Sequence, residues 1–310
     1  MIARIVAMAL LVATVLPSAP SASSATGVSA KQKVPCALCL YGPDNMAFDA
    51  RGNIYLVDTD HAMRSRVLKL SPEGKVLAEW HVFRAVPGQD NGPAGIALDG
   101  HGDILVTDPE AVLKLSPSGK LLATIGADAR ARDPQGHVAV DRQGDIYLAQ
   151  AQRNLIRKFS PDGKLLASWH REQGSGVEQW NHPEQVSLAP DGNLVVQDWG
   201  NHRMMILSTS GRTISTFDAT PGVPLAQAST SSSCVDGKGH IFVADYQLHR
   251  IQEFDSQGRL LATIGNTPGN LLFEKAPNSL AIDGNGYLYA TDGLSVVKFS
   301  RAGKLLARWR

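Results

Sequence analysis

Five oxygen-bearing side chains occupy matching places in a segment that recurs along this sequence. Each follows a proline in the pattern P-x-x-apolar: Asp44, Asn45, Glu184, Gln185 and Asn278. Hard cations such as Ca²⁺ take about six to eight oxygen ligands from carboxylates, amides and water. If the recurring segments converge on one point, Asp44, Asn45, Glu184 and Asn278 become candidate calcium ligands. A polar, hydrated opening that holds no metal is the alternative.

His137 stands at the corresponding place of another copy of the segment. A bound cation would polarise a lactone or ester carbonyl and lower the pKa of a bound water, which a nearby histidine could deprotonate. His137 is therefore the candidate general base. Pairing of Cys234 with His137 as nucleophile and base is a further alternative. Cys234 replaces a small alanine of the repeat, however, which favours a buried apolar side chain.

The repeat indicates how these residues are positioned. A unit of the form P-x-x-apolar-A-apolar-D, then G-[ND]-apolar-aromatic, then S-P-x-G-K-L-L-A recurs six times, every 40 to 50 residues or so. Each copy holds four short apolar runs, which is typical of a β-propeller blade. The first strands of such a ring surround a central channel, so their starts meet at its mouth. We predict an all-β, six-bladed β-propeller of four-stranded antiparallel blades over 43–82, 93–126, 134–170, 183–218, 228–265 and 277–310.

A ring of aspartates invites a catalytic interpretation, but a structural one is simpler. Five of the six second strands end in aspartate: Asp58, Asp108, Asp198, Asp245 and Asp292. We expect these carboxylates to accept backbone N–H groups from the tight loops that follow them. The last blade ends with its own fourth strand, so either the segment 31–42 pairs on an edge or side-chain packing alone closes the ring.

Two blades carry a more specific signature. Residues 198–207 read DWGNHRMMIL and residues 244–254 read ADYQLHRIQEF. Both resemble the NHL repeat, in which an Asp precedes an Asn-His-Arg-like loop and an apolar strand. The resemblance implies a six-bladed propeller, in agreement with the count of repeats. Aromatic residues on a propeller face are natural contact residues. The candidate partner-binding residues are Trp199, His202, Tyr246, His249 and Trp180, although His202 and His249 are also suited to holding their loops in place.

Two enzyme families show weaker resemblances. The openings Pro43-Asp44-Asn45-Met46 and Pro277-Asn278-Ser279-Leu280 are similar to those of gluconolactonase-like propellers, with Asn45 and Ser279 in place of that family's glycine. That resemblance implies a calcium site at the channel mouth. The segment 244–254 also resembles the amidating lyase that cleaves peptidyl-α-hydroxyglycine, which uses channel histidines to bind zinc. Three such histidines at suitable spacing are not evident here.

The N-terminal residues favour export. Arg4, the apolar run Ile5–Leu16 and a small-residue cleavage site near Ala25 predict a secretory signal peptide over 1–25. The apolar run is too short to span a bilayer, so we expect no membrane span in the mature chain and an extracytoplasmic location, periplasmic or secreted. A lead-in over 26–42 holds Cys36 and Cys39, for which a structural disulfide, unpaired thiols and redox or metal chemistry remain open.

The sequence thus predicts a binding or scaffold module that recognises a protein or small-molecule ligand at one propeller face. The formal net charge of +1 lacks the positive footprint that phosphate backbones require, so nucleic acid is not an expected partner. The alternative function is a calcium-dependent hydrolase or lyase acting at the channel mouth, with zinc as a less favoured metal. The two functions differ in whether the mouth carboxylates and His137 converge on one point.

Overall fold

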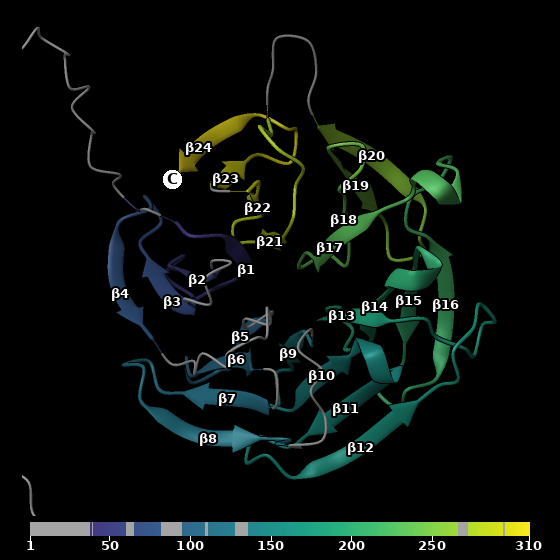
Figure 1. Cartoon of the computed structure of the whole chain (residues 1–310), viewed down its shortest axis with the longest axis horizontal. Helices are drawn as coiled ribbons and strands as arrows, with labels where there is room; N and C mark the ends of the chain where they lie inside the picture. Colours follow the sequence, from purple (N-terminus) through teal and green to yellow (C-terminus); the bar gives the residue numbers. More distant parts are fainter. Residues whose placement is uncertain are drawn as a thin grey trace, which may run out of the picture. The chain divides into compact units, whose positions relative to one another are not determined.

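Short strands follow one another along the chain, and every four consecutive strands form one antiparallel sheet. The computed structural model describes residues 38, 40–59, 65–81, 95–108, 111–127, 136–265, 272–293 and 295–310. These residues belong to the unit Cys36–Arg310, in which six sheets surround a common centre (Figure 1). The predicted six-bladed β-propeller is confirmed. The predicted signal peptide and both cysteines of the lead-in lie outside the described residues.

Each blade contributes one strand to each of four concentric layers. The innermost strands are β1 (Pro43–Phe48), β5 (Ile96–Leu98), β9 (Val138–Val140), β13 (Pro183–Leu188), β17 (Thr230–Val235) and β21 (Leu280–Ile282). The second strands are β2 (Ile54–Thr59), β6 (Ile104–Asp108), β10 (Ile146–Gln150), β14 (Leu194–Asp198), β18 (Ile241–Asp245) and β22 (Leu288–Thr291).

The two outer layers complete the blades. The third strands are β3 (Ser65–Leu70), β7 (Ala111–Leu115), β11 (Leu155–Phe159), β15 (Arg203–Leu207), β19 (Arg250–Phe254) and β23 (Val296–Phe299). The fourth strands are β4 (Val76–Trp80), β8 (Leu121–Ile125), β12 (Leu165–His170), β16 (Thr213–Asp218), β20 (Leu260–Gly265) and β24 (Leu305–Trp309). The helices among the described residues are three short 3-10 turns, η1 (Ala151–Arg153), η2 (Trp199–Asn201) and η3 (Leu225–Gln227), and none has the length or hydrophobicity of a membrane span.

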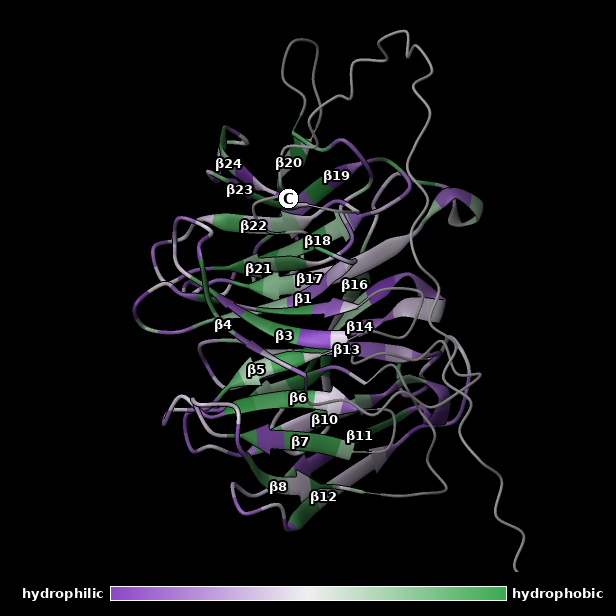
Figure 2. Cartoon of the chain, turned by 60° about the vertical axis from the view of Figure 1, so that its left-hand side comes forward, coloured by the Kyte–Doolittle hydropathy of each residue, from purple (hydrophilic) through white to green (hydrophobic). Residues whose placement is uncertain are grey.

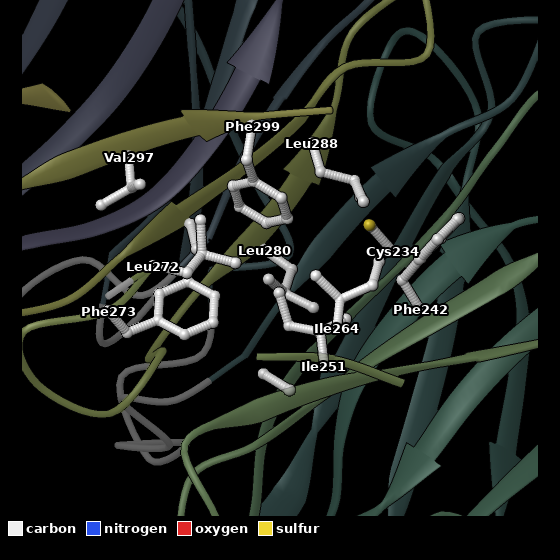
Figure 3. Packing of buried hydrophobic residues seen from close by; sticks show 12 residues of the cluster. Cys234, Phe242, Ile251, Ile264, Leu272, Phe273, Leu280, Leu288, Val297 and Phe299 are labelled. Carbon is white, nitrogen blue, oxygen red and sulfur yellow. The ribbon is translucent and has the colours of Figure 1, made fainter. Parts of the chain in front are cut away.

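The hydrophobic core lies between the blades. Second-strand side chains face the neighbouring blades on both sides, so β14 and β18 are buried along their whole length. Fourth strands face solvent, and in β16 exposed and half-buried residues alternate. Figure 2 shows hydrophobic residues along much of the strands and hydrophilic residues in many of the turns and loops. Between blades 5 and 6, Cys234 packs with Phe242, Leu280 and Leu288 in one apolar cluster (Figure 3).

Side-chain packing closes the ring. Trp309 of β24 lies against the β3–β4 turn of blade 1, where a Cβ atom on Gly74 would come within 2.0 Å of the indole. Its indole N–H donates to the Glu73 carbonyl at 2.7 Å. Trp80 makes the same contact with Gly119 of blade 2 and donates to the preceding carbonyl at 3.0 Å. Blade 6 therefore joins blade 1 as blade 1 joins blade 2, and no strand exchange occurs among the described residues.

The aspartates at the ends of the second strands are structural, although the expected loop contact is wrong in part. Asp58 accepts the N–H groups of Tyr41 and Gly42 at 2.8 and 3.0 Å, and these precede the inner strand rather than follow Asp58. Its other oxygen accepts Arg66 Nε at 2.8 Å. Among the described residues, Asp245 accepts a backbone N–H from the loop after it, at Leu248, whereas Asp198 and Asp292 accept side-chain donors from those loops, at Asn201 and Ser295. The same pairing with arginine recurs in three more blades: Asp198–Arg203, Asp245–Arg250 and Asp292–Arg308.

Candidate functional site: the channel mouth

Strand register shows which residues meet at one end of the channel. Met46, Val186 and Leu280 each pair with the residue two before the closing aspartate of their blade (Asp58, Asp198 or Asp292), so they are equivalent. The residues two before them in sequence are Asp44, Glu184 and Asn278, as the sequence predicts. We call the face of the ring at which the innermost strands begin the mouth face, and the residues at these strand starts the mouth.

Asp44 and Glu184 are the charged residues of the mouth. They belong to blades 1 and 4, which are opposite one another in a ring of six (Figure 1). Burial raises the pKa of Asp44 to about 7. Burial, and to a smaller extent the charge of Asp44, raises the pKa of Glu184 to about 7. Both side chains are half-buried, and neither has a hydrogen-bond donor or an ion-pair partner among the described residues. Within the described part of the chain, the mouth therefore holds two carboxyl groups without compensating positive charge.

His137 lies one residue deeper and is held by Asn45. The Asn45 side-chain oxygen accepts the Met46 N–H at 2.8 Å, which leaves its NH₂ group to donate to His137 Nδ1 at 2.8 Å. His137 therefore carries its proton on Nε2 when neutral. Burial lowers its pKa to about 4. At neutral pH the ring presents an N–H donor at Nε2, so the geometry favours a hydrogen-bonding role for His137 over its predicted role as a general base.

Below the mouth the channel encloses about 480 Å³. Asn45, His137 and Gln185 line its mouth end, and Asp49 and Gly284 line the other end. Cys234 lies on the wall and is 8% exposed, and burial together with the charge of Asp236 raises the pKa of its thiol. A protonated, buried thiol is a poor nucleophile. The predicted buried character of Cys234 is confirmed.

Blade 4 contributes a strained residue to the rim of the mouth. His182 has a φ of +58° and directly precedes Pro183, a combination that costs about 1–3 kcal/mol. Glycine, at Gly42, is the equivalent residue of blade 1. The His182 N–H donates to Asn154 Oδ1 at 3.0 Å, and its carbonyl accepts the Trp199 N–H at 3.1 Å. These contacts hold the imidazole beside the start of β13.

The hydrogen bonds of Asn181 determine the tautomer of His182. Asn181 Nδ2 donates to the Gly200 carbonyl at 3.0 Å, so Asn181 Oδ1 is the acceptor that contacts Gln173 Nε2 at 3.1 Å and His182 Nδ1 at 3.0 Å. In the neutral ring His182 donates from Nδ1, so its Nε2 then carries a lone pair, to which no described residue donates. His137 and His182 are thus held by asparagines in opposite tautomers. Sequence reasoning left His182 out of the site, although a histidine directly before a P-x-x-apolar opening was a usable signal.

The five predicted contact residues are divided by the structure. Trp199 and Tyr246 are 42% and 47% exposed on the mouth face, and Trp199 meets the His182 ring edge-on at 6.3 Å. His202 and His249 take positive φ values of 51° at the ends of the same loops. The prediction that Trp180 is an exposed contact residue is wrong, because its side chain is fully buried.

Three of the four predicted calcium ligands lie at one level of the mouth, and the fourth makes other hydrogen bonds. Asp44, Glu184 and Asn278 lie at one level of the mouth, whereas the amide of Asn45 is engaged by Met46 and His137. Among the described residues, no three His, Cys, Asp or Glu side chains gather closely enough to hold a metal ion. Calcium binding therefore stays a prediction that depends on two carboxylates, one amide and water.

Comparison with known proteins supports the fold and the type of repeat. No protein-family model matches the sequence. Residues of the chain are 32% identical over 133 positions to peptidyl-glycine alpha-amidating monooxygenase of Mus musculus, covering 38% of the chain and 14% of that protein. They are 30% identical over 107 positions to NHL repeat-containing protein 3 of Homo sapiens, covering 31% and 30%. The chain thus spans less than a third of the length of either relative.

Solved structures match nearly the whole chain. A streptogramin B lyase superposes with a TM-score of 0.62 at 16% identity, covering 90% of this chain and 84% of that one. A gluconolactonase from Xanthomonas campestris superposes with a TM-score of 0.61 at 17% identity, covering 84% and 86%. This protein is an NHL-like six-bladed β-propeller. At such low identities the structural matches show the fold alone.

Proposed function

We propose that this propeller is a binding module that holds a small ligand with positive charge at the channel mouth. The observation that supports it is the pair Asp44 and Glu184, which repel each other across the ring and have no cationic partner among the described residues. Asp58, Asp99 and Asp198, by contrast, are paired with Arg or Lys. A buried like-charged pair is costly unless a bound cation or a proton compensates it.

The proposal includes an extracytoplasmic location for the protein. A signal peptide over 1–25 and the C-x-x-C of the lead-in support an extracytoplasmic protein, so its ligand would be a periplasmic or extracellular molecule. Calcium is one candidate for the positive charge, because it is hard and accepts carboxylate, amide and water oxygens. Export is tested separately, by N-terminal sequencing of the protein recovered from the secreted or periplasmic fraction.

A hydrolase or lyase acting at the same mouth is the second candidate. Carboxyl groups with pKa values near 7 can both donate and accept protons at neutral pH, as a general acid and base must. Lyases and a gluconolactonase are among the proteins of similar fold. Turnover of lactones or esters that is lost in Glu184→Gln would support this candidate over simple binding.

Ligand-dependent melting tests the proposed function. The purified mature chain is melted in EDTA, then with Ca²⁺, Zn²⁺ and a panel of small cationic, neutral and anionic molecules. A ligand at a hundredfold excess over its Kd adds about 2.7 kcal/mol to the free energy of unfolding. We expect a cationic ligand to raise the midpoint in the wild type and not in the double variant Asp44→Asn/Glu184→Gln.

The control is Asp191→Asn, which removes an exposed carboxylate from a turn at the opposite end of β13 and should respond as the wild type does. A midpoint shift that persists in the double variant would move binding away from the mouth. A panel without any effective cation would count against the proposed function.

A further inference from the structure

The groups that surround the mouth share an electrostatic character. Besides the two carboxyl groups, the neutral His182 ring offers a lone pair at Nε2, to which no described residue donates a hydrogen bond. The indole of Trp199 and the phenol ring of Tyr246 offer exposed faces, which carry negative quadrupole charge. Carboxylates, an imidazole lone pair and aromatic faces all attract N–H⁺ groups, and none of them attracts an anion.

Among the described residues, the exposed aromatic side chains of the mouth face belong to two neighbouring blades. Trp199 and Tyr246 each follow the aspartate that ends the second strand, in the neighbouring blades 4 and 5. The equivalent residues of blades 1, 3 and 6 are Thr59, Ala151 and Gly293, and Ala151 is buried. Trp199 contacts His182, which is two residues from Glu184. The aromatic surface is thus continuous with the acidic mouth on this side.

Four arginines of the described part of the mouth face make structural contacts. Arg66, Arg203 and Arg250 each pair with the aspartate that ends their own blade's second strand, at 2.8 to 2.9 Å. Arg308 is paired with Asp292 in the same way. Because these four cations are paired within the blades, none of them compensates the charge of Asp44 and Glu184.

A buried hydroxyl at the mouth also lacks a partner. Ser279 follows Asn278 and is 2% exposed, and its Oγ makes no hydrogen bond within the described part of the chain. The equivalent Ser232 of blade 5 has partners, because its Oγ accepts the Leu280 N–H at 3.0 Å. A buried polar atom without a partner is uncommon and calls for an explanation such as a ligand or a water molecule.

From these observations we propose that the ligand is an organic ammonium ion on an aromatic or apolar body. The ammonium group lies between Glu184, Asp44 and His182 Nε2, and the body stacks on Trp199 and Tyr246. This inference rests on the proposed function and names its ligand class. A metal ion alone would make no use of the aromatic rim, and a carboxylate or phosphate ligand would be repelled by the mouth.

Three probes of nearly equal size test the inference: 2-phenylethylamine, 2-phenylethanol and 3-phenylpropanoate. They are titrated into the mature protein by isothermal calorimetry at pH 7.5 in EDTA. We expect the amine to bind at least tenfold more tightly than the alcohol, and the acid not to bind. Trp199→Ala should weaken amine binding about five- to tenfold through the lost stacking and cation–π contacts. Tyr287→Ala, which removes a 39% exposed aromatic residue from the opposite face, is the matched control and should change nothing.

His182→Gly separates recognition from folding. Glycine suits the positive φ at this position, so the variant should keep a melting temperature close to that of the wild type. Amine affinity should nevertheless fall several-fold because the acceptor is lost. Equal binding of amine and alcohol would overturn the inference, as would a Trp199→Ala variant with wild-type affinity. A different result is that Ca²⁺ stabilises the wild type and not the double carboxyl variant while the amine does not bind. That result would support the proposed function and contradict the inference that the ligand is an ammonium ion.

Discussion

Asp44 and Asp49 stand at the two ends of one inner segment, and their surroundings differ in kind. Burial alone would raise the pKa of Asp49, but hydrogen bonds from Asn53 and the Arg51 N–H, together with the charge of Lys69, outweigh it and lower the pKa. The pKa of Asp99 is lowered in the same way, with Lys114 as its ion-pair partner. Asp44 has no such partners, and its pKa is raised to about 7. Asp49 and Asp99 are thus compensated by donors and a cation, whereas no described residue compensates Asp44.

The largest difference that we expect between structural and mouth aspartates is in the free energy of unfolding. Asp198→Ala should lower the free energy of unfolding by about 3–5 kcal/mol, because Arg203 is left without its buried partner and Asn181 loses its acceptor. Asp44→Ala should change it by less than about 1 kcal/mol, since no described contact is lost. Urea unfolding at pH 7 measures both. Similar losses in the two variants would mean that Asp44 is structural as well.

The pH dependence of stability gives a smaller effect with a definite sign. Asp44 and Glu184 hold their protons up to about pH 7 in the folded state, whereas the unfolded chain releases them near pH 4. Their contribution to the free energy of unfolding is therefore fully present below the pKa of the unfolded chain, and it is lost as pH rises through about 7. His137 acts in the opposite sense, because its folded pKa of about 4 makes its contribution decline as pH falls from 6.5 toward 4.

Because two carboxyl groups outweigh one imidazole, we expect the free energy of unfolding to fall between about pH 5 and pH 7.5. Partial exposure of the side chains limits the fall to roughly 1–3 kcal/mol. Urea unfolding across this range in EDTA measures it, and Asp44→Asn/Glu184→Gln should flatten the curve. A wild-type curve that rises toward pH 7.5, or a double variant with the same slope, would show that the mouth pair is not protonated as described.

The sequence was sufficient to identify the mouth, because blade register follows from the repeat itself. Once Pro43, Pro183 and Pro277 are aligned, Asp44, Glu184 and Asn278 must occupy one level of a closed ring. The contacts between blades could not be predicted in this way. Burial of Trp180 depends on how the loop 171–182, to which it belongs, folds. The tautomer of His137 depends on Asn45, which is 92 residues away, and that of His182 on how the Gly200 carbonyl orients Asn181.

The smallest predicted effect distinguishes the two causes of the raised pKa of Glu184. Burial is the larger cause and the charge of Asp44 the smaller, so Asp44→Asn should lower the pKa of Glu184 only partway toward its ordinary value. Carboxyl-carbon NMR titration of Glu184 in wild type and variant measures the change. A return to the ordinary value would make charge repulsion the dominant cause, and the mouth would then be a hydrated site that water already stabilises. A pKa that stays raised shows that the walls of the mouth desolvate Glu184, which is the condition under which an incoming cation gains most from pairing with it.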